Sequence, residues 1–105
     1  MRARDWSTAQ SLLRGALRQQ PNNAQLHAQL GNVLDRSGNA SEALNEYRAA
    51  TRIDRRNVGY LHRLTDLQLA TGDRAGAVAT LRQILTIAPG DPAATRRLAA
   101  LQPSG

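Results

Sequence analysis

The stretch GNVLDRSGNASEALNEYRAATRID, residues 31–54, decides the fold because its pattern returns 34 residues later. The second copy reads TDLQLATGDRAGAVATLRQILTIA over residues 65–88. The pairs that coincide at this offset are Leu30 with Leu64, Gly38 with Gly72, Ala43 with Ala77, Leu44 with Val78, and Tyr47 with Leu81. Self-similarity at a fixed period of this length is the signature of a repeat protein.

Each copy is expected to form two helices. Residues 24–36 carry apolar side chains at helical spacing, and Ser37 and Gly38 end that helix. Asn39 begins the second helix, and Glu42 completes a capping box with it. The expected buried stripe of this second helix is Ala43, Leu44, Tyr47, Ala50 and Ile53. A helix pair cannot bury its apolar face alone, so we expect neighbouring pairs to stack.

The two ends of the chain depart from this plan. Residues 6–20 read as one helix with Asp5 as its cap, and they match only the second helix of a copy. At the other end, Asp91 and Pro92 open a last helix, with proline at the first helical position. We therefore expect a chain that begins with half a repeat and ends with a capping helix.

The predicted architecture is all-α, a solenoid of antiparallel helix pairs with five helices in a single domain, residues 1–105. Its parts are the second helix of an incomplete repeat at 5–21, full repeats at 24–55 and 58–89, a capping helix at 92–101, and a loose tail at 102–105.

The composition limits the function classes. The 105 residues are 41% hydrophobic but only 3% aromatic, which allows one modest core. Cysteine is absent, so disulfides and thiolate metal sites are excluded. No apolar run approaches the roughly 18 residues of a membrane span, so we expect a soluble protein, with the cytoplasm favoured and the periplasm open if a longer parent is exported. The formal charge is +6 and every basic residue is Arg, which suits bidentate contact with carboxylate or phosphate.

These residues resemble the tetratricopeptide repeat, a unit of about 34 residues with the pattern W-x2-L-G-x2-Y, A-x3-F, P. The first copy carries His27-x2-Leu30-Gly31-x2-Leu34 and Ala43-x3-Tyr47. The second carries Leu61-x2-Leu64-Thr65-x2-Gln68, Ala77-x3-Leu81 and Pro89, and the opening stretch adds Ala9-x3-Leu13 and Pro21. Thr65 and Gln68 replace Gly and Tyr of the pattern, so we expect looser packing in the second copy.

The resemblance implies that the first helix of each pair lines a concave groove, which holds an extended peptide or a partner's helix. The residues that it places on this surface are Gln25, Ala28, Gln29, Asn32 and Arg36 from the first copy, His62, Arg63, Asp66 and Leu69 from the second, and Arg96 and Arg97 from the last helix. Asn32 matches the Asn that touches peptide backbone in many members. Members that bind acidic C-terminal tails carry Lys one turn earlier, where this chain has Ala28, so that clamp is incomplete.

An acidic partner segment is still compatible with this groove, because Arg63, Arg96 and Arg97 give one end of it a positive character. A second set of arginines recurs at the same offset on the second helices, and the resemblance places it on the convex side. The set is Arg14, Arg48 and Arg82, with Arg18 and Arg52. Stacking aromatic side chains are missing there, so we expect a solvated face and no nucleic-acid binding.

The sequence predicts no catalytic residue, no metal site and no cofactor. His27 occupies a packing position of the pattern and is expected to be structural, whereas His62 either binds a ligand in the groove or is simply exposed. Asp35 and Asp66 are the only acidic candidates for catalysis, and we expect no catalytic pair from them.

The predicted function is therefore a non-catalytic protein–protein interaction scaffold, a piece of a longer repeat protein, with a protein or peptide as partner. One alternative is an accessory domain of a larger enzyme or of a secretion or export assembly. Another is a self-association module, whose interface is the N-terminal edge formed by Trp6, Ala9 and Leu12. An open solenoid end exposes apolar surface, which is why this edge is a candidate for contact with a second copy.

Overall fold

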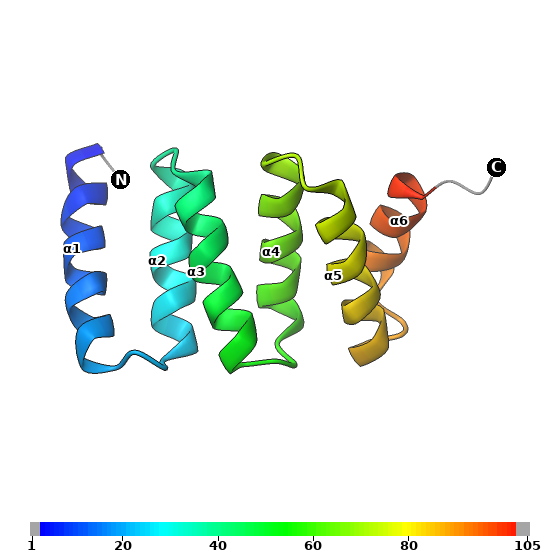
Figure 1. The fold of residues 1–105 in the computed structure, drawn as a ribbon, viewed down its shortest axis with the longest axis horizontal. Coiled ribbons are helices and arrows are strands. Elements are labelled where there is room, and N and C mark those ends of the chain that lie inside the picture. Colours follow the sequence, from blue (N-terminus) through cyan, green and yellow to red (C-terminus); the bar gives the residue numbers. More distant parts are fainter. Residues whose placement is uncertain (1–2, 103–105) are drawn as a thin grey trace. The chain divides into compact units, whose positions relative to one another are not determined.

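The computed structural model describes residues 3–102 as helices joined by short turns (Figure 1). The helices are α1 (Ala3–Gln19), α2 (Ala24–Arg36), α3 (Ala40–Ile53), α4 (Val58–Ala70), α5 (Arg74–Ile87) and α6 (Pro92–Leu101). These residues form no strand, so the predicted all-α class is confirmed. None of these helices combines the length and the apolar character that a membrane span requires.

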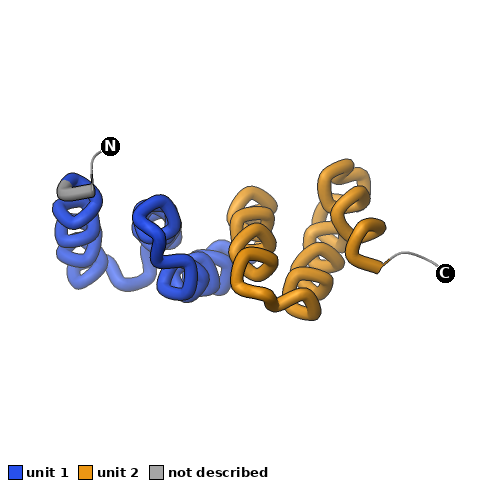
Figure 2. The backbone as a smooth tube through the Cα atoms, turned by 90° about the horizontal axis from the view of Figure 1, so that it is seen from above, with its two compact units in different colours: residues 1–55 blue, residues 56–105 orange. Residues whose placement is uncertain are grey.

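The chain divides into two compact units, residues 1–55 and residues 56–105 (Figure 2). Unit 1 contains α1, α2 and α3, and unit 2 contains α4, α5 and α6. The single domain expected from the sequence stays a prediction. The loose tail expected at 102–105 lies outside the described residues except for Gln102, whose side chain accepts a hydrogen bond from Arg82 at 2.7 Å.

The expected count of five helices is wrong, because the described part of the chain holds six. The half repeat contributes one helix, each full repeat contributes two, and the capping helix is the last. Each of these helices needs its own start signal. Four of the starts have a side-chain cap that accepts from the backbone N–H three residues later. These caps are Asn23 for Leu26, Asn57 for Tyr60, Asp73 for Gly76, and Asp91 for Ala94.

Two further expectations at helix starts are wrong. Asp5 does not precede α1, because the helix begins at Ala3 and Asp5 lies in its first turn, where a carboxylate favours the helix dipole. The capping box is not formed, since the Asn39 side chain makes no cap hydrogen bond. The backbone N–H of Asn39 already donates to the Leu34 carbonyl at 2.8 Å, so it is not available to Glu42.

That Leu34 contact belongs to the turn that ends α2. Gly38 has φ +92° and donates its N–H to the Asp35 carbonyl at 3.1 Å, which completes the two bonds of a Schellman motif. Gly72, with φ +83°, ends α4 in the same way. These two glycines have backbone conformations that residues with a side chain adopt only with strain. The repeated glycines of the sequence are therefore explained by helix termination.

Unit 1 depends on a close approach between α2 and α3. A Cβ atom at Gly31 of α2 would lie 2.8 Å from ring atoms Cδ2 and Cε2 of Tyr47 on α3. Tyr47 is only 4% exposed, so its ring has little room to shift. Glycine is thus the residue that lets these two helices pack at this separation. The other buried apolar residues of the two helices are Ala28, Leu30, Val33, Leu34, Ala43 and Ala50.

Unit 2 fills the corresponding space with different side chains. Thr65 and Leu81 stand 34 residues after Gly31 and Tyr47, and both are fully buried. The larger residue on α4 is thus accompanied by a smaller one on α5. The Thr65 hydroxyl donates to the Leu61 carbonyl at 3.0 Å, which satisfies it inside the helix.

Gln68, the second departure from the pattern, is also buried, and it accepts a hydrogen bond from the Thr80 hydroxyl on α5 at 2.8 Å. No buried side-chain nitrogen or oxygen among the described residues lacks a partner. Unit 2 therefore accommodates both polar residues, and the looser packing expected there stays a prediction. Its apolar core consists of Leu61, Leu81, Ile84 and Ala94, with Val58, Leu85, Ile87, Leu98 and Leu101 packed against them.

The apolar stripe expected on α3 is only partly buried. Ala43, Tyr47 and Ala50 are buried as expected, but Ile53 at the end of the helix is 40% exposed. It lies in the last turn of α3, next to the exposed Asp54 that follows the helix. Its side chain borders a hollow on the surface of unit 1.

Candidate functional site

One face of α2 carries the groove residues predicted for unit 1. The residues are Gln25, Gln29, Asn32 and Arg36, whose spacing places them on one side of a helix. Three of them are exposed and Asn32 is half-buried. Ala28, expected on the same surface, is buried at 8% exposure, because it lies one turn before Gly31 on the packed side of the helix. The exposed face is therefore polar throughout.

Arg36 at the end of this face has a partner in α1. Its guanidinium carbon lies 5.4 Å from the centroid of the Trp6 ring, within the range of a cation–π interaction. Arg36 was expected to face a ligand, and Trp6 was expected at the N-terminal edge. The structure brings the two together across α1 and α2, so this arginine also fastens α1 to α2.

The other residues of the N-terminal edge differ in exposure. Leu12 is 70% exposed, whereas Trp6 and Ala9 are half-buried. No described side chain of α1 is fully buried. Leu12 is thus the apolar residue that this edge offers to solvent.

In unit 2 the predicted groove residues lie on α4 and α6, and two polar pairs connect them. The His62 ring nitrogen Nε2 lies 3.0 Å from Oδ2 of Asp91, the residue that caps α6. Arg97 of α6 forms an ion pair with Asp66 of α4. His62 is half-buried, so it is neither simply exposed nor without a partner. Both contacts fasten α6 to α4.

Arg63 and Arg96 differ from Arg97, because both are exposed and neither forms an ion pair with another described residue. The Arg97 charge is balanced by Asp66. The positive charge available to a ligand on this face therefore comes from Arg63 and Arg96. Leu69, also expected here, is half-buried.

Asp91 is held in its ionised form by its surroundings. The backbone N–H of Ala94 donates to its carboxylate at 2.9 Å, and His62 contacts the other oxygen. The pKa of Asp91 is therefore lower than usual, first because of the Ala94 hydrogen bond and then because of the His62 contact.

His27 forms a polar junction of unit 1 that the sequence did not predict. Its Nε2 lies 2.8 Å from the Pro21 carbonyl, and its Nδ1 lies 2.8 Å from Oε1 of Glu46 on α3. A carbonyl and an ionised carboxylate can only accept, so both contacts are hydrogen bonds only when both ring nitrogens carry protons. His27 thereby links the α1–α2 turn, α2 and α3, in agreement with a structural role.

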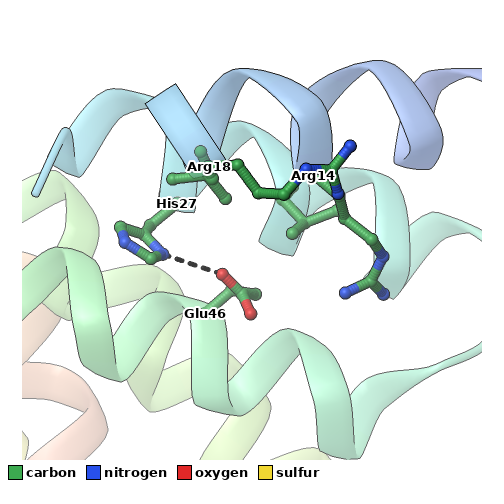
Figure 3. A pocket seen from close by; sticks show the side chains of 6 residues that line it. Arg14, Arg18, His27 and Glu46 are labelled. Atoms are coloured by element: carbon green, nitrogen blue, oxygen red, sulfur yellow. Dashed lines mark hydrogen bonds and ion pairs between the residues drawn. The ribbon is translucent and has the colours of Figure 1, made fainter. Parts of the chain in front are cut away.

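A cleft of about 350 Å³ opens beside this junction in unit 1. Figure 3 shows Arg14 and Arg18 of α1 on one side of it and the His27–Glu46 pair on the other. Leu17 and Leu30 complete its lining. The sequence singled out Arg14 and Arg18 only as part of a solvated face, and it gave no role to Glu46. The feature of the sequence that could have indicated this junction is His27 at a packing position of the repeat pattern, because a partly buried imidazole requires polar partners.

Residues 3–102 contain no group of three His, Cys, Asp or Glu side chains that could hold a metal ion. The polar pairs described above are also the contacts that hold helices together. The arrangement can hydrogen-bond to a peptide and can pair with carboxylates.

Comparisons with protein families and with solved structures both find proteins similar to this chain. The tetratricopeptide repeat family model matches residues 1–67. A search of curated proteins finds no match. The structure is similar to that of MamA, with a TM-score of 0.82 and 16% identity over 92% of this chain and 57% of MamA, so the chain spans little more than half of that protein.

Two further similar structures contain a bound segment. PcrH in complex with the chaperone binding region of PopD has a TM-score of 0.78 and 22% identity, over 94% of this chain and 80% of that one. The first repeat domain of Spaghetti (RPAP3), bound to an HSP90 peptide, has a TM-score of 0.76 and 17% identity, over 91% of this chain and 78% of that one. At these identities the likeness supports the fold.

Asp91→Asn provides a test of the contacts that dock α6. Because the folded-state pKa of Asp91 is below the unfolded value of about 3.9, the ionised carboxylate stabilises the fold above that value and loses its effect as the pH falls through the folded-state pKa. Asparagine can still cap the helix. We therefore expect the variant to have a lower melting temperature than the wild type at neutral pH, and expect this difference to vanish in strong acid. Thermal unfolding, monitored by circular dichroism at neutral pH and in strong acid, measures the melting temperatures of both proteins.

Asp35→Asn is the matched control, since Asp35 is an exposed carboxylate without an ion pair among the described residues. An equal difference for the control, or a difference for Asp91→Asn that persists in strong acid, would contradict the docking role of the Asp91 charge.

Proposed function

Because the chain belongs to the tetratricopeptide repeat family, we propose that it is a non-catalytic scaffold that binds a peptide or a partner segment. The proposed contacts in unit 1 are Gln25, Gln29 and Asn32 of α2, and the proposed contacts in unit 2 are Arg63 and Arg96. The observation that carries the proposal is the exposed polar face of α2, which lies opposite a packed face.

The chemistry of this face suits a peptide backbone. The side-chain amides of Gln25, Gln29 and Asn32 each offer both donors and an acceptor, as an extended peptide requires. Asn32 is half-buried, which limits its rotamers and lowers the entropy cost of holding a ligand. PcrH and Spaghetti, which share the fold, hold segments of other proteins. We infer the same class of ligand for this chain.

An acidic segment is the partner chemistry that unit 2 favours. Arg63 and Arg96 are exposed and free of ion pairs with described residues, so each can pair with a carboxylate of a ligand. Arg97 would first have to leave Asp66, and His62 would have to leave Asp91. We therefore assign these two residues to the docking of α6 and the charge recognition to Arg63 and Arg96.

The groove is tested with peptides selected from a displayed random library against the wild-type protein. The double variant Asn32→Ala, Arg63→Ala removes one amide and one charge from the proposed surface, and we expect it to bind the selected peptides at least about tenfold more weakly. The matched control, Asn45→Ala with Arg56→Ala, removes the same groups from exposed positions elsewhere and should bind like the wild type. Unchanged affinity of the first variant means that the groove is not the binding surface.

The accessory-domain alternative uses the same surfaces, with the chain acting as part of a larger enzyme or of a secretion or export assembly. A separate observation favours the self-association alternative, because Leu12 is 70% exposed on α1. Burial of such a side chain between two copies would stabilise a dimer by about 1.5–3 kcal/mol per leucine.

Self-association predicts a mass that rises with concentration in light scattering, and a return to the monomer mass in Leu12→Ser. Leu12 lies outside the predicted groove, so this variant should bind selected peptides normally. A wild-type protein that stays monomeric at millimolar concentration contradicts the alternative.

A further inference from the structure

Unit 1 contains a second surface that the groove proposal does not use, and we call it the α1–α3 cleft. It is the cleft of about 350 Å³ lined by Arg14, Leu17, Arg18, His27, Leu30 and Glu46. Its residues from α2 are His27 and Leu30, which the helical repeat places on the opposite side of α2 from the Gln25–Asn32 face. A ligand in this cleft would therefore leave the groove face of α2 free.

The lining of the cleft is apolar at its base and polar at its walls. Leu30 is buried at 1% exposure and Leu17 is half-buried. Arg18 is exposed on one wall, and the Glu46 carboxylate lies on the other. A mainly apolar lining with a few placed polar groups is the usual character of a ligand pocket.

Two of the three charged side chains of the cleft already have a partner within unit 1. Arg14 pairs with Glu42 at 3.1 Å, and Glu46 is occupied by His27 at 2.8 Å. Arg18 has no ion pair among the described residues. It is the charge in the cleft that remains available to a ligand.

A smaller hollow of about 240 Å³ adjoins the cleft, because His27 lines both. Its lining includes Arg52 and Ile53 of α3. Arg52 is exposed and has no ion pair among the described residues, and Ile53 is 40% exposed. This hollow therefore has an arginine without an ion pair and an accessible apolar side chain, as the cleft has with Arg18 and Leu17.

We propose that the α1–α3 cleft binds an acidic peptide segment, with a leucine-like side chain of the ligand against Leu17 and carboxylates paired with Arg18 and Arg52. Charge complementarity selects this ligand, since two exposed guanidiniums without intramolecular partners favour bidentate contact with carboxylates. The half-buried Leu17 side chain is the apolar surface of the cleft that remains accessible, and it selects an aliphatic neighbour of the acid. The side chains that line the two hollows include no Phe, Tyr or Trp, which disfavours single-stranded nucleic acid, whose bases stack on large aromatic rings.

The probe for this site is a capped tripeptide in which leucine stands between two aspartates. It is titrated into the ¹⁵N-labelled chain and followed by amide chemical shifts. We expect the largest shifts around Leu17, Arg18 and His27 and along the end of α3 that carries Arg52. The matched tripeptide with asparagines in place of aspartates should bind at least about tenfold more weakly, because it lacks the charge-assisted contacts.

The double variant Arg18→Gln, Arg52→Gln should weaken binding of the acidic tripeptide about tenfold or more. Arg55→Gln with Arg56→Gln is its control, since it removes the same charge from exposed residues outside both hollows. Circular dichroism checks that both variants fold. We expect the control to bind like the wild type, and we expect the Arg18, Arg52 variant to bind library-selected groove peptides normally.

Four results would overturn the proposal. The two tripeptides bind equally, or the control variant loses as much affinity as the cleft variant. The shifts fall on Gln25, Asn32 or Arg63 instead, which would place the acidic ligand in the groove. A single-stranded oligonucleotide binds the cleft amides more tightly than the tripeptide, which would assign the surface to nucleic acid. The failure of the groove proposal is separate, because that test uses Asn32 and Arg63, which the cleft does not include.

Discussion

The approach of Gly31 to the ring of Tyr47 is the constraint on which unit 1 depends. The absence of a Cβ at Gly31 lets α2 and α3 pack where any side chain would lie 2.8 Å from the ring. This contact fixes which side of α2 is buried, and it therefore fixes which sides remain available. One available side presents amides to solvent, and on the opposite side the half-buried His27 lines the α1–α3 cleft. The packing at one glycine therefore bears on both proposed binding surfaces.

Polar pairs then separate the residues that hold helices from the residues that can hold ligands. Arg36 lies on Trp6, Arg97 pairs with Asp66, and His62 contacts Asp91, so all three join neighbouring helices. A side chain that already has a partner must lose it before it binds a ligand, which costs free energy. The exposed residues without such partners are consequently the better candidates for recognition, even where the family pattern places several arginines on one surface.

The sequence could predict what depends on local signals. The helix ends at Gly38 and Gly72 and the start at Pro92 need only a few neighbouring residues, and the structure has them. The capping box failed because the Asn39 N–H was taken by Leu34, a competition that the motif alone does not reveal. The contacts His27–Glu46 and Asp66–Arg97 join residues 19 and 31 positions apart, so they depend on how the helices pack. The groove residues came from the family pattern, and their joint surface stays a proposal.

The dependence of the α2–α3 packing on the sizes of Gly31 and Tyr47 is tested by a double-mutant cycle in unit 1. Gly31→Thr and Tyr47→Leu together convert this pair to the Thr65 and Leu81 of unit 2. The free energy of unfolding is measured in urea for the wild type, both single variants and the double variant. Matched sizes predict that Gly31→Thr alone lowers the free energy of unfolding by about 1–3 kcal/mol. Adding Tyr47→Leu, which replaces the ring by a smaller side chain, should then recover at least about 1 kcal/mol of this loss. Costs that simply add in the double variant would contradict this dependence on size.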